Sequence, residues 1–373
     1  MLEGLDRINW QDLEHAYGSA EDVPEQIRAL ASNDKQTREQ AYTQLWGNII
    51  HQGTVYSATA YAVPFLIELL QSPHVKDKPQ LLVLVTALAC GSSYHEAHQP
   101  LFQDVGVFTE EMQQPEWHRQ LQEERGWVEG AWQAVVAGTP TYLSLLADPH
   151  PETRFCAAYA LAVCGEHASE IVPQLQRQLK VEKDARVQAS MLLCLSCIAG
   201  SAGVPLFEEH LQSGSPLTRA IAALCWVRVA KGQAPKLAID VISDVLTNPH
   251  PIDTLYTQLP WADGESVVAA ASQALGQSGS EAAEDVVPRV LDALDRLQKH
   301  DTASVSMVGL VLALSFEPHK ERRSPDLTDL QRYVLTRLAQ SQRAWDWGNV
   351  YFIFRQFGLP DDQKKLRRFL EEA

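Results

Sequence analysis

The sequence predicts an all-α fold, an α-solenoid of about seven two-helix repeats, and three observations support this prediction. Arg154, Arg186 and Arg219 are spaced 32 and 33 residues apart. A Val-Pro pair at 172–173 returns 32 residues later at 204–205, each time opening a similar helix. Second helices such as RFCAAYALAVCG, SMLLCLSCIAG and AIAALCWVRVA are apolar on more than one face. Such a helix is typical of a stacked array, because neighbours cover it on both sides.

Each repeat is predicted to contain two helices. The first starts near a proline and carries apolar residues at helical spacing, as in 141–146. The second follows a proline-containing start, DPHP at 148–151 and NPHP at 248–251, whose rings favour a first helical turn. Ala158 and Ala222 lie on second helices and are expected to face neighbouring helices. The predicted repeats are 23–50, 60–91, 138–166, 169–200, 203–232, 235–279 and 281–316.

The chain as a whole, 1–373, is predicted to form a single α-solenoid domain. After the last repeat, helices at 326–341, 344–358 and 361–372 are expected to cap the array. The period is broken between the second and third repeats and again at 251–263. The parts in order are N-terminal repeats at 1–91, an acidic insertion at 92–137, central repeats at 138–316 and capping helices at 317–373.

One block resembles a known family of repeats. The stretch SLLADPHPETRFCAAYALAVCGEHASEIVPQL is similar to HEAT and HEAT-like repeats of the phycobilisome-lyase type. The resemblance implies the HEAT-like solenoid fold and says little about function, since such repeats serve many roles. The residues that carry it are Asp148, Pro149, Arg154, Ala157, Ala158, Leu161 and Gly165.

The N-terminal segment has a more particular resemblance. INWQDLEHAYGSAEDVP, followed by IIHQGTVYSATAYAVPFLIELL, is similar to the start of a group of bacterial HEAT-repeat proteins. These occur as accessory or immunity-like gene products. The resemblance implies an immunity-like role without naming an activity.

The insertion is the strongest candidate for a partner contact. Between Ser92 and Gly130 it carries eight acidic residues against two basic ones. Insertions into repeat arrays project from one face and often bind partners. Alternatively, the insertion covers an edge between repeats, with its tryptophans packed inside and its acids solvated. The candidate contact residues are Glu110, Glu111, Trp117, Glu123, Glu124 and Trp127.

His51 and Gln52 are two further candidate contacts, because the HQGT segment lies between the first and second repeats. There they could line the inner surface and bond a partner. In the alternative interpretation, Gly53 ends one helix and Thr54 or Ser57 caps the next.

The overall charge limits the class of partner. The chain has 31 Lys and Arg against 47 Asp and Glu, a formal charge of −16. Nucleic-acid binding is disfavoured, because phosphate contacts need clustered cations. A basic protein is the expected partner, with the chain a monomer when free.

Six cysteines without a paired motif, and no apparent leader, favour a reducing cytoplasm. The uncharged run 187–207 is too mildly apolar to predict a membrane span.

No catalytic pattern stands out. Cys194 and Cys197 form a C-x-x-C, but a zinc site needs a second ligand pair, so buried thiols are expected. His95-Glu96 is a single His-Glu pair, whereas the HEAT-like deoxyhypusine hydroxylases carry several. We therefore expect no metal, no cofactor and no enzymatic activity.

The sequence thus predicts a non-catalytic protein-binding solenoid. The leading hypothesis is a bacterial immunity or antitoxin-type protein that masks a basic toxin. The alternatives are a generic scaffold or chaperone and, more remotely, a HEAT-like lyase or metal-dependent hydroxylase.

Overall fold

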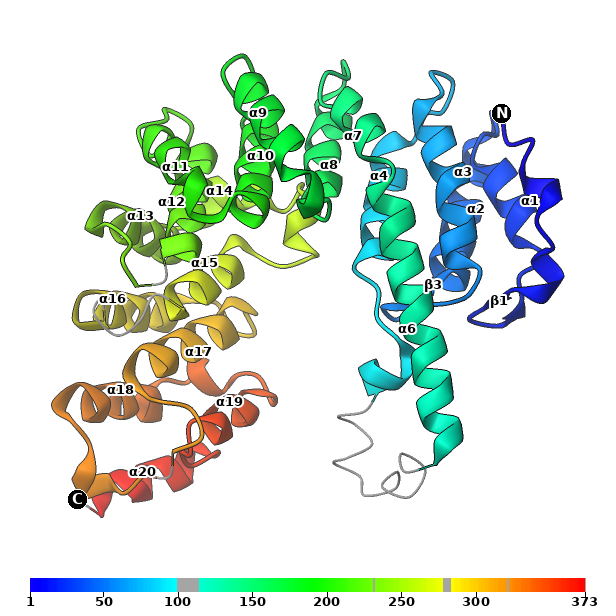
Figure 1. Cartoon of the computed structure of the whole chain (residues 1–373). Helices are drawn as coiled ribbons and strands as arrows, with labels where there is room; N and C mark the ends of the chain where they lie inside the picture. The colour runs from blue at the N-terminus through cyan, green and yellow to red at the C-terminus, as the bar shows by residue number, and fades with distance from the viewer. Residues whose placement is uncertain (99–113, 231, 278–282, 321, 373) are drawn as a thin grey trace. The chain divides into compact units, whose positions relative to one another are not determined.

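A computed structural model describes residues 1–98, 114–230, 232–277, 283–320 and 322–372 (Figure 1). Within these ranges the chain is all-α, built from successive helix pairs, and its sheet consists of two short hairpins. The predicted fold class is confirmed. The contacts divide the chain into two compact parts, Met1–Glu182 and Lys183–Ala373. We call them unit 1 and unit 2 and describe each by itself.

Unit 1 contains the first three predicted repeats. Helix α1 packs on α2, α3 on α4, and α7 on α8, while α4 and α8 pack together. The hairpins are β1–β2, before α1, and β3–β4, between α2 and α3. The helices are α1 (Val23–Ala29), α2 (Lys35–Asn48), α3 (Thr59–Gln71), α4 (Lys78–Ala89), α6 (Pro115–Val136), α7 (Thr139–Leu145), α8 (Pro151–Leu161) and α9 (Ala168–Leu179).

Helix α6 lies in the segment predicted to be an insertion. It runs beside α3 and α4 and packs on both (Figure 1). Ala131, Val135 and Val136 near its end are buried. The last third of the predicted insertion is therefore part of the packed helices, as the edge-covering alternative expected. Glu110 and Glu111 lie outside the described residues.

The repeated arginines hold the loop before each second helix. Arg38, Arg154 and Arg219 each donate a hydrogen bond to a main-chain carbonyl six residues earlier. Arg186 differs, since it pairs with Asp184 two residues before it. The regular spacing in the sequence thus reflects a recurring side-chain brace of the loop.

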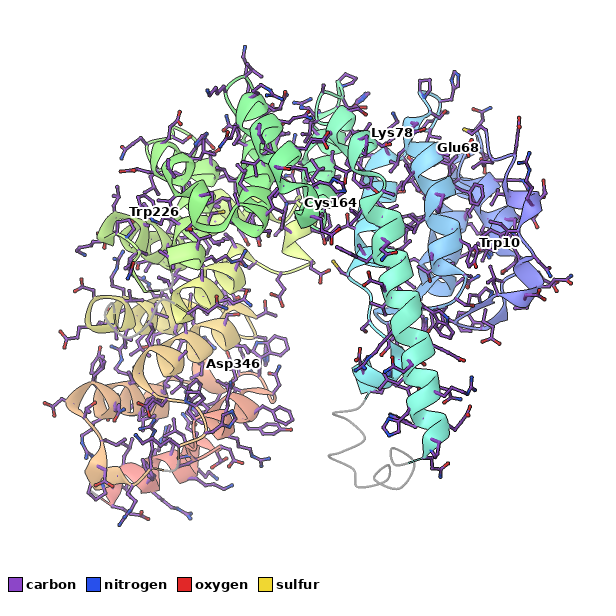
Figure 2. All side chains as sticks on the ribbon, in the orientation of Figure 1. Trp10, Glu68, Lys78, Cys164, Trp226 and Asp346 are labelled. Carbon is purple, nitrogen blue, oxygen red and sulfur yellow. The ribbon has the colours of Figure 1, made fainter. Side chains whose placement is uncertain are left out.

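A ladder of ion pairs follows the second helices of unit 1. Two pairs join a cation near the start of one helix to a carboxylate just before the next, and the third joins Arg154 of α8 to Glu182 at the end of the unit. Figure 2 labels Lys78, the middle cation. The side chain of Glu182, which ends the ladder, is 4% exposed. The three pairs are Arg38–Asp77, Lys78–Asp148 and Arg154–Glu182.

Unit 2 contains the second helix of the fourth predicted repeat, the three later repeats and the predicted caps. Its second helices α10, α12, α15 and α17 pack in succession, and α13, α16 and α18 pack beside them. The helices are α10 (Ala185–Ile198), α11 (Val204–His210), α12 (Pro216–Ala230), α13 (Lys236–Thr247), α14 (His250–Tyr256), α15 (Val267–Gly276), α16 (Ala283–Arg296), α17 (Ala303–Ser315), α18 (Asp329–Gln340), α19 (Val350–Gln356) and α20 (Gln363–Glu371).

The lengthened sixth repeat folds back within unit 2. Its extra residues form α14 and a short 3-10 turn, Pro260–Ala262, and α14 packs on α12. The indole N–H of Trp261 donates to the Ser190 hydroxyl over 2.7 Å, and Arg186 donates to Gln258 over 2.9 Å. The extra residues thus cover the start of α10.

Small residues let the second helices approach closely, as predicted. Ala158 in unit 1 and Ala222 in unit 2 are fully buried. Cys194 is buried, whereas Cys197 is exposed, so the expectation of a buried pair is wrong for Cys197.

Across the described residues, no helix combines the length and apolarity that a membrane crossing demands.

Candidate partner-binding surface

The segment with His51 and Gln52 forms a β-hairpin. Helix α2 ends at Asn48, and Ile50–His51 then pairs antiparallel with Thr54–Val55. Gln52 and Gly53 make the two-residue turn with φ values of 50° and 84°. Such left-handed pairs match the twist of a tight hairpin. The interpretation that Gly53 ends a helix is wrong, because the chain forms strands there.

The other hairpin, β1–β2, places Tyr17 next to His51. Glu14–His15 pairs with Gly18–Ser19, and Tyr17 lies in the turn with 70% of its surface exposed. Its phenol oxygen is 3.3 Å from Nδ1 of His51, and the two rings meet edge to face with centroids 5.4 Å apart. Two hairpins separated in sequence therefore bring their tips together.

Main-chain hydrogen bonds fix the first hairpin on the helices. The Ala16 amide donates to the Asn48 carbonyl over 3.0 Å. The Ala58 amide donates to the Glu14 carbonyl over 3.1 Å, and the Glu14 amide donates to Oγ of Ser57 over 2.8 Å. Ser57 thus anchors the other hairpin rather than capping a helix.

Tyr56 connects the hairpin tips to the region after α4. Its phenol lies 2.9 Å from the Thr54 hydroxyl. Burial raises the pKa of Tyr56, and the neighbouring Tyr17, Tyr94 and Glu124 raise it further, since each disfavours a second negative charge. The Val55 amide donates to the Ser92 carbonyl over 3.1 Å, α6 packs on β4, and Tyr17 meets His51, so both hairpins, the segment after α4 and α6 share one neighbourhood.

Glu124 holds His95 in this neighbourhood. Its carboxylate accepts hydrogen bonds from the His95 amide over 3.0 Å and from Nδ1 over 2.7 Å. Trp117 meets the His95 ring edge to face, with centroids 4.2 Å apart. Glu124 is 7% exposed. Its expected place among the solvated acids at a contact rim is wrong, because it is a buried partner of His95.

The other described candidates on α6 have different surroundings. Glu123 is exposed and pairs with Arg119, which also pairs with Glu116. Trp117 and Trp127 are half-buried. Of the candidates on hairpin β3–β4, Gln52 is exposed and His51 is half-buried. The structure thus unites His51 with Tyr17 and Trp117 with His95.

We define the hairpin surface as the group around Tyr56. Tyr94 is 46% exposed, and its ring stacks on His98 with centroids 4.2 Å apart. Sequence reasoning missed Tyr17, Tyr56 and Tyr94, since their proximity depends on hairpins that short polar segments do not reveal. The local turn signals are the glycines, Gly18 in one hairpin and Gly53 in the other, both with positive φ. The members are Tyr17, His51, Gln52, Tyr56, Tyr94, His95, Trp117 and Glu124.

The charge of the chain is concentrated in the unit that carries this surface. Unit 1 has 24 acidic and 11 basic residues, a formal charge of −13. Unit 2 has 23 acidic and 20 basic residues, a formal charge of −3. Among the described residues, no group of three or more His, Cys, Asp or Glu is arranged to hold a metal ion.

Comparisons with known proteins assign this chain to no family. No family model matches the sequence, and no curated protein matches it. One solved structure, described as the crystal structure of an engineered protein, covers 94% of this chain and 98% of its own, with 19% identity and a TM-score of 0.33. At that TM-score the similarity carries no argument about fold or function.

Proposed function

We propose that this chain is a non-catalytic protein-binding protein whose unit 1 recognises a basic partner. The observation that carries the proposal is the hairpin surface, where exposed Tyr17 and Tyr94 gather near Tyr56. Tyrosine offers a large contact area with little conformational freedom to lose, and it is enriched where proteins bind each other. Main-chain bonds already hold the hairpins in place, which lowers the ordering cost of binding.

The charge of unit 1 supports the choice of a basic partner. A formal charge of −13 attracts cationic proteins and accelerates their association. The same charge repels the phosphates of nucleic acids. Shape and aromatic contacts would then supply the affinity once the partner has arrived.

Within this class, we propose a bacterial immunity or antitoxin role. Many toxins that attack nucleic acids or nucleotides are basic proteins, and an acidic binding surface suits their inhibition. In this role the chain acts in the cytoplasm as a monomer when free, and binding alone masks the toxin without a cofactor.

Co-expression tests the proposal. A gene next to this one that encodes a basic protein would be expressed alone and together with this chain. We expect growth inhibition that this chain relieves, and a stoichiometric complex on gel filtration that weakens as salt increases. Growth inhibition that the chain does not relieve, with no complex formed, would contradict the proposal.

A further inference from the structure

Asp22 is held by three buried side chains. Its Oδ1 lies 3.0 Å from Nε2 of His15, and its Oδ2 accepts from Nε2 of Gln26 over 2.7 Å and from Nδ2 of Asn48 over 3.2 Å. These three residues are 6% to 8% exposed, whereas the side chain of Asp22 is 53% exposed. Buried polar groups from the hairpin, α1 and α2 thus fix one half-exposed carboxylate.

The His15 tautomer follows from its two contacts. Nδ1 of His15 accepts a hydrogen bond from the Tyr17 amide over 3.0 Å. In the neutral ring, Nε2 therefore carries the proton and donates it to Asp22. Asp22 also precedes α1, and its side chain makes no capping hydrogen bond to the main chain of that helix. Its carboxylate is turned toward the network instead of capping its own helix.

This carboxylate borders a polar groove between α1 and α2. The groove has a volume of about 310 Å³. The described residues that line it include no basic side chain. Its polar lining is formed by Asp22, Glu25, Gln26, Thr37, Gln40 and Gln44.

We propose that this groove binds an arginine side chain of a basic protein partner. A guanidinium has five donors in a planar fork and pairs with carboxylates in two-bond geometry. Asp22 already accepts three hydrogen bonds, so it offers the fork one further acceptor position, on Oδ1, while Glu25 offers a second carboxylate and the glutamines offer amide oxygens. A lysine ammonium lacks the planar fork, so the groove should prefer arginine. That the arginine belongs to a basic protein rests on the proposed function. The preference of the groove for arginine does not rest on it.

Hydrogen bonds of the buried His15 connect the groove to the hairpin surface. His15 bonds Asp22 on one side and the Tyr17 amide on the other. The Tyr17 ring in turn contacts His51. A partner that covers the tyrosines can therefore place a neighbouring arginine in the groove, in the unit with a formal charge of −13.

The competing explanation is that the Asp22 network only ties the first hairpin to the helices. Under that explanation, removal of Asp22 lowers stability and no ligand preference exists. Glu25 separates the two explanations, because it lines the groove and is not one of the three side chains that bond Asp22. Glu25→Gln therefore changes the groove charge without touching the network.

The experiment measures peptide binding to the full chain. Fluorescein-labelled peptides of alternating glycine and arginine, or glycine and lysine, are titrated with the protein at 150 mM salt and followed by anisotropy. The variants are Glu25→Gln and Asp22→Asn. The matched control is Glu166→Gln with Glu170→Gln, two exposed acids of unit 1 distant in sequence from the groove. Thermal midpoints check that each variant is folded.

The expected result is tighter binding of the arginine peptide by the wild type, and a loss of about tenfold in Glu25→Gln and in Asp22→Asn. The control should change the affinity less than about twofold. An equal loss of affinity in the control would overturn the proposal that the groove binds arginine. Binding would then be explained by general electrostatic attraction to unit 1. A wild type that binds neither peptide, or binds both alike, would also overturn it, and co-expression would still decide the proposed function.

Discussion

Units 1 and 2 share one architecture and differ in what they add to it. Both stack second helices through fully buried small residues such as Ala158 and Ala222. Unit 1 adds two hairpins and a formal charge of −13, whereas unit 2 adds a folded-back segment and a formal charge of −3. The repeats thus supply a common scaffold, and the connections between helices distinguish the two units.

One ion pair in each unit shows how burial changes the expected contribution. In unit 1, Arg154 and Glu182 have side chains 16% and 4% exposed. In unit 2, Arg289 joins α16 to the exposed Asp244 of α13, with side chains 36% and 76% exposed. Buried pairs are costly to break, while exposed pairs contribute little. We therefore expect stability to depend more on the Arg154–Glu182 pair than on the Arg289–Asp244 pair.

Arg154→Ala should have the largest effect. It removes the guanidinium that faces the buried Glu182 carboxylate and should lower the free energy of unfolding by about 3–5 kcal/mol. Arg219→Ala, which removes one exposed bond to a carbonyl in unit 2, should cost about 1 kcal/mol or less. Urea denaturation followed by circular dichroism measures both. Equal losses of unfolding free energy in the two variants would contradict the expected difference between these two arginines.

Overpacking tests whether the two stacks are alike. Ala158→Phe and Ala222→Phe insert a ring where the alanine is fully buried, and each should cost about 1–3 kcal/mol. Denaturation midpoints of the two variants should fall together. An unchanged midpoint for either one would mean that its helix is not packed as described.

Glu124→Gln should destabilise unit 1 more than Glu123→Gln. Glu124 is buried and accepts two bonds from His95, so loss of one acceptor and the charge should cost about 1–3 kcal/mol. Glu123 is exposed, and its pair with Arg119 should contribute little to stability, because solvent screens it. Thermal midpoints compare the two variants. A larger loss for Glu123→Gln would refute the assignment of Glu124 as the structural acid.

Unit 2 should show a small acid-range effect at its last helix. Lys365 and Arg355 hold the pKa of Asp361 down to about 2, below its ordinary value. A depressed folded pKa gives stability that is present above the unfolded pKa and is lost as pH falls through about 2. The midpoint of Asp361→Asn should lie slightly below wild type at pH 6 and coincide with it near pH 2. A gap that widens toward pH 2 would contradict this sign.

The repeats could be predicted because local pattern determines them. The spacing of Arg154, Arg186 and Arg219 marked second helices correctly, since each lies in the first turn of one. The hairpins were missed because strands of two residues, such as Ile50–His51, are too short to show an alternating pattern. His95 and Glu124 are 29 residues apart, and nothing local in the sequence reveals that they bond.

The measurement that tests the central claim most directly compares matched aromatic variants of the two units. Tyr17→Ala with Tyr94→Ala removes exposed rings from the hairpin surface, and Tyr333→Ala with Phe352→Ala removes exposed rings from unit 2. The affinity of each for the basic partner found by co-expression is measured by calorimetry. We predict a loss of about tenfold or more for the unit 1 pair and less than about twofold for the unit 2 pair. Wild-type affinity in the unit 1 pair, with a loss in the unit 2 pair, would contradict the claim that unit 1 binds the partner.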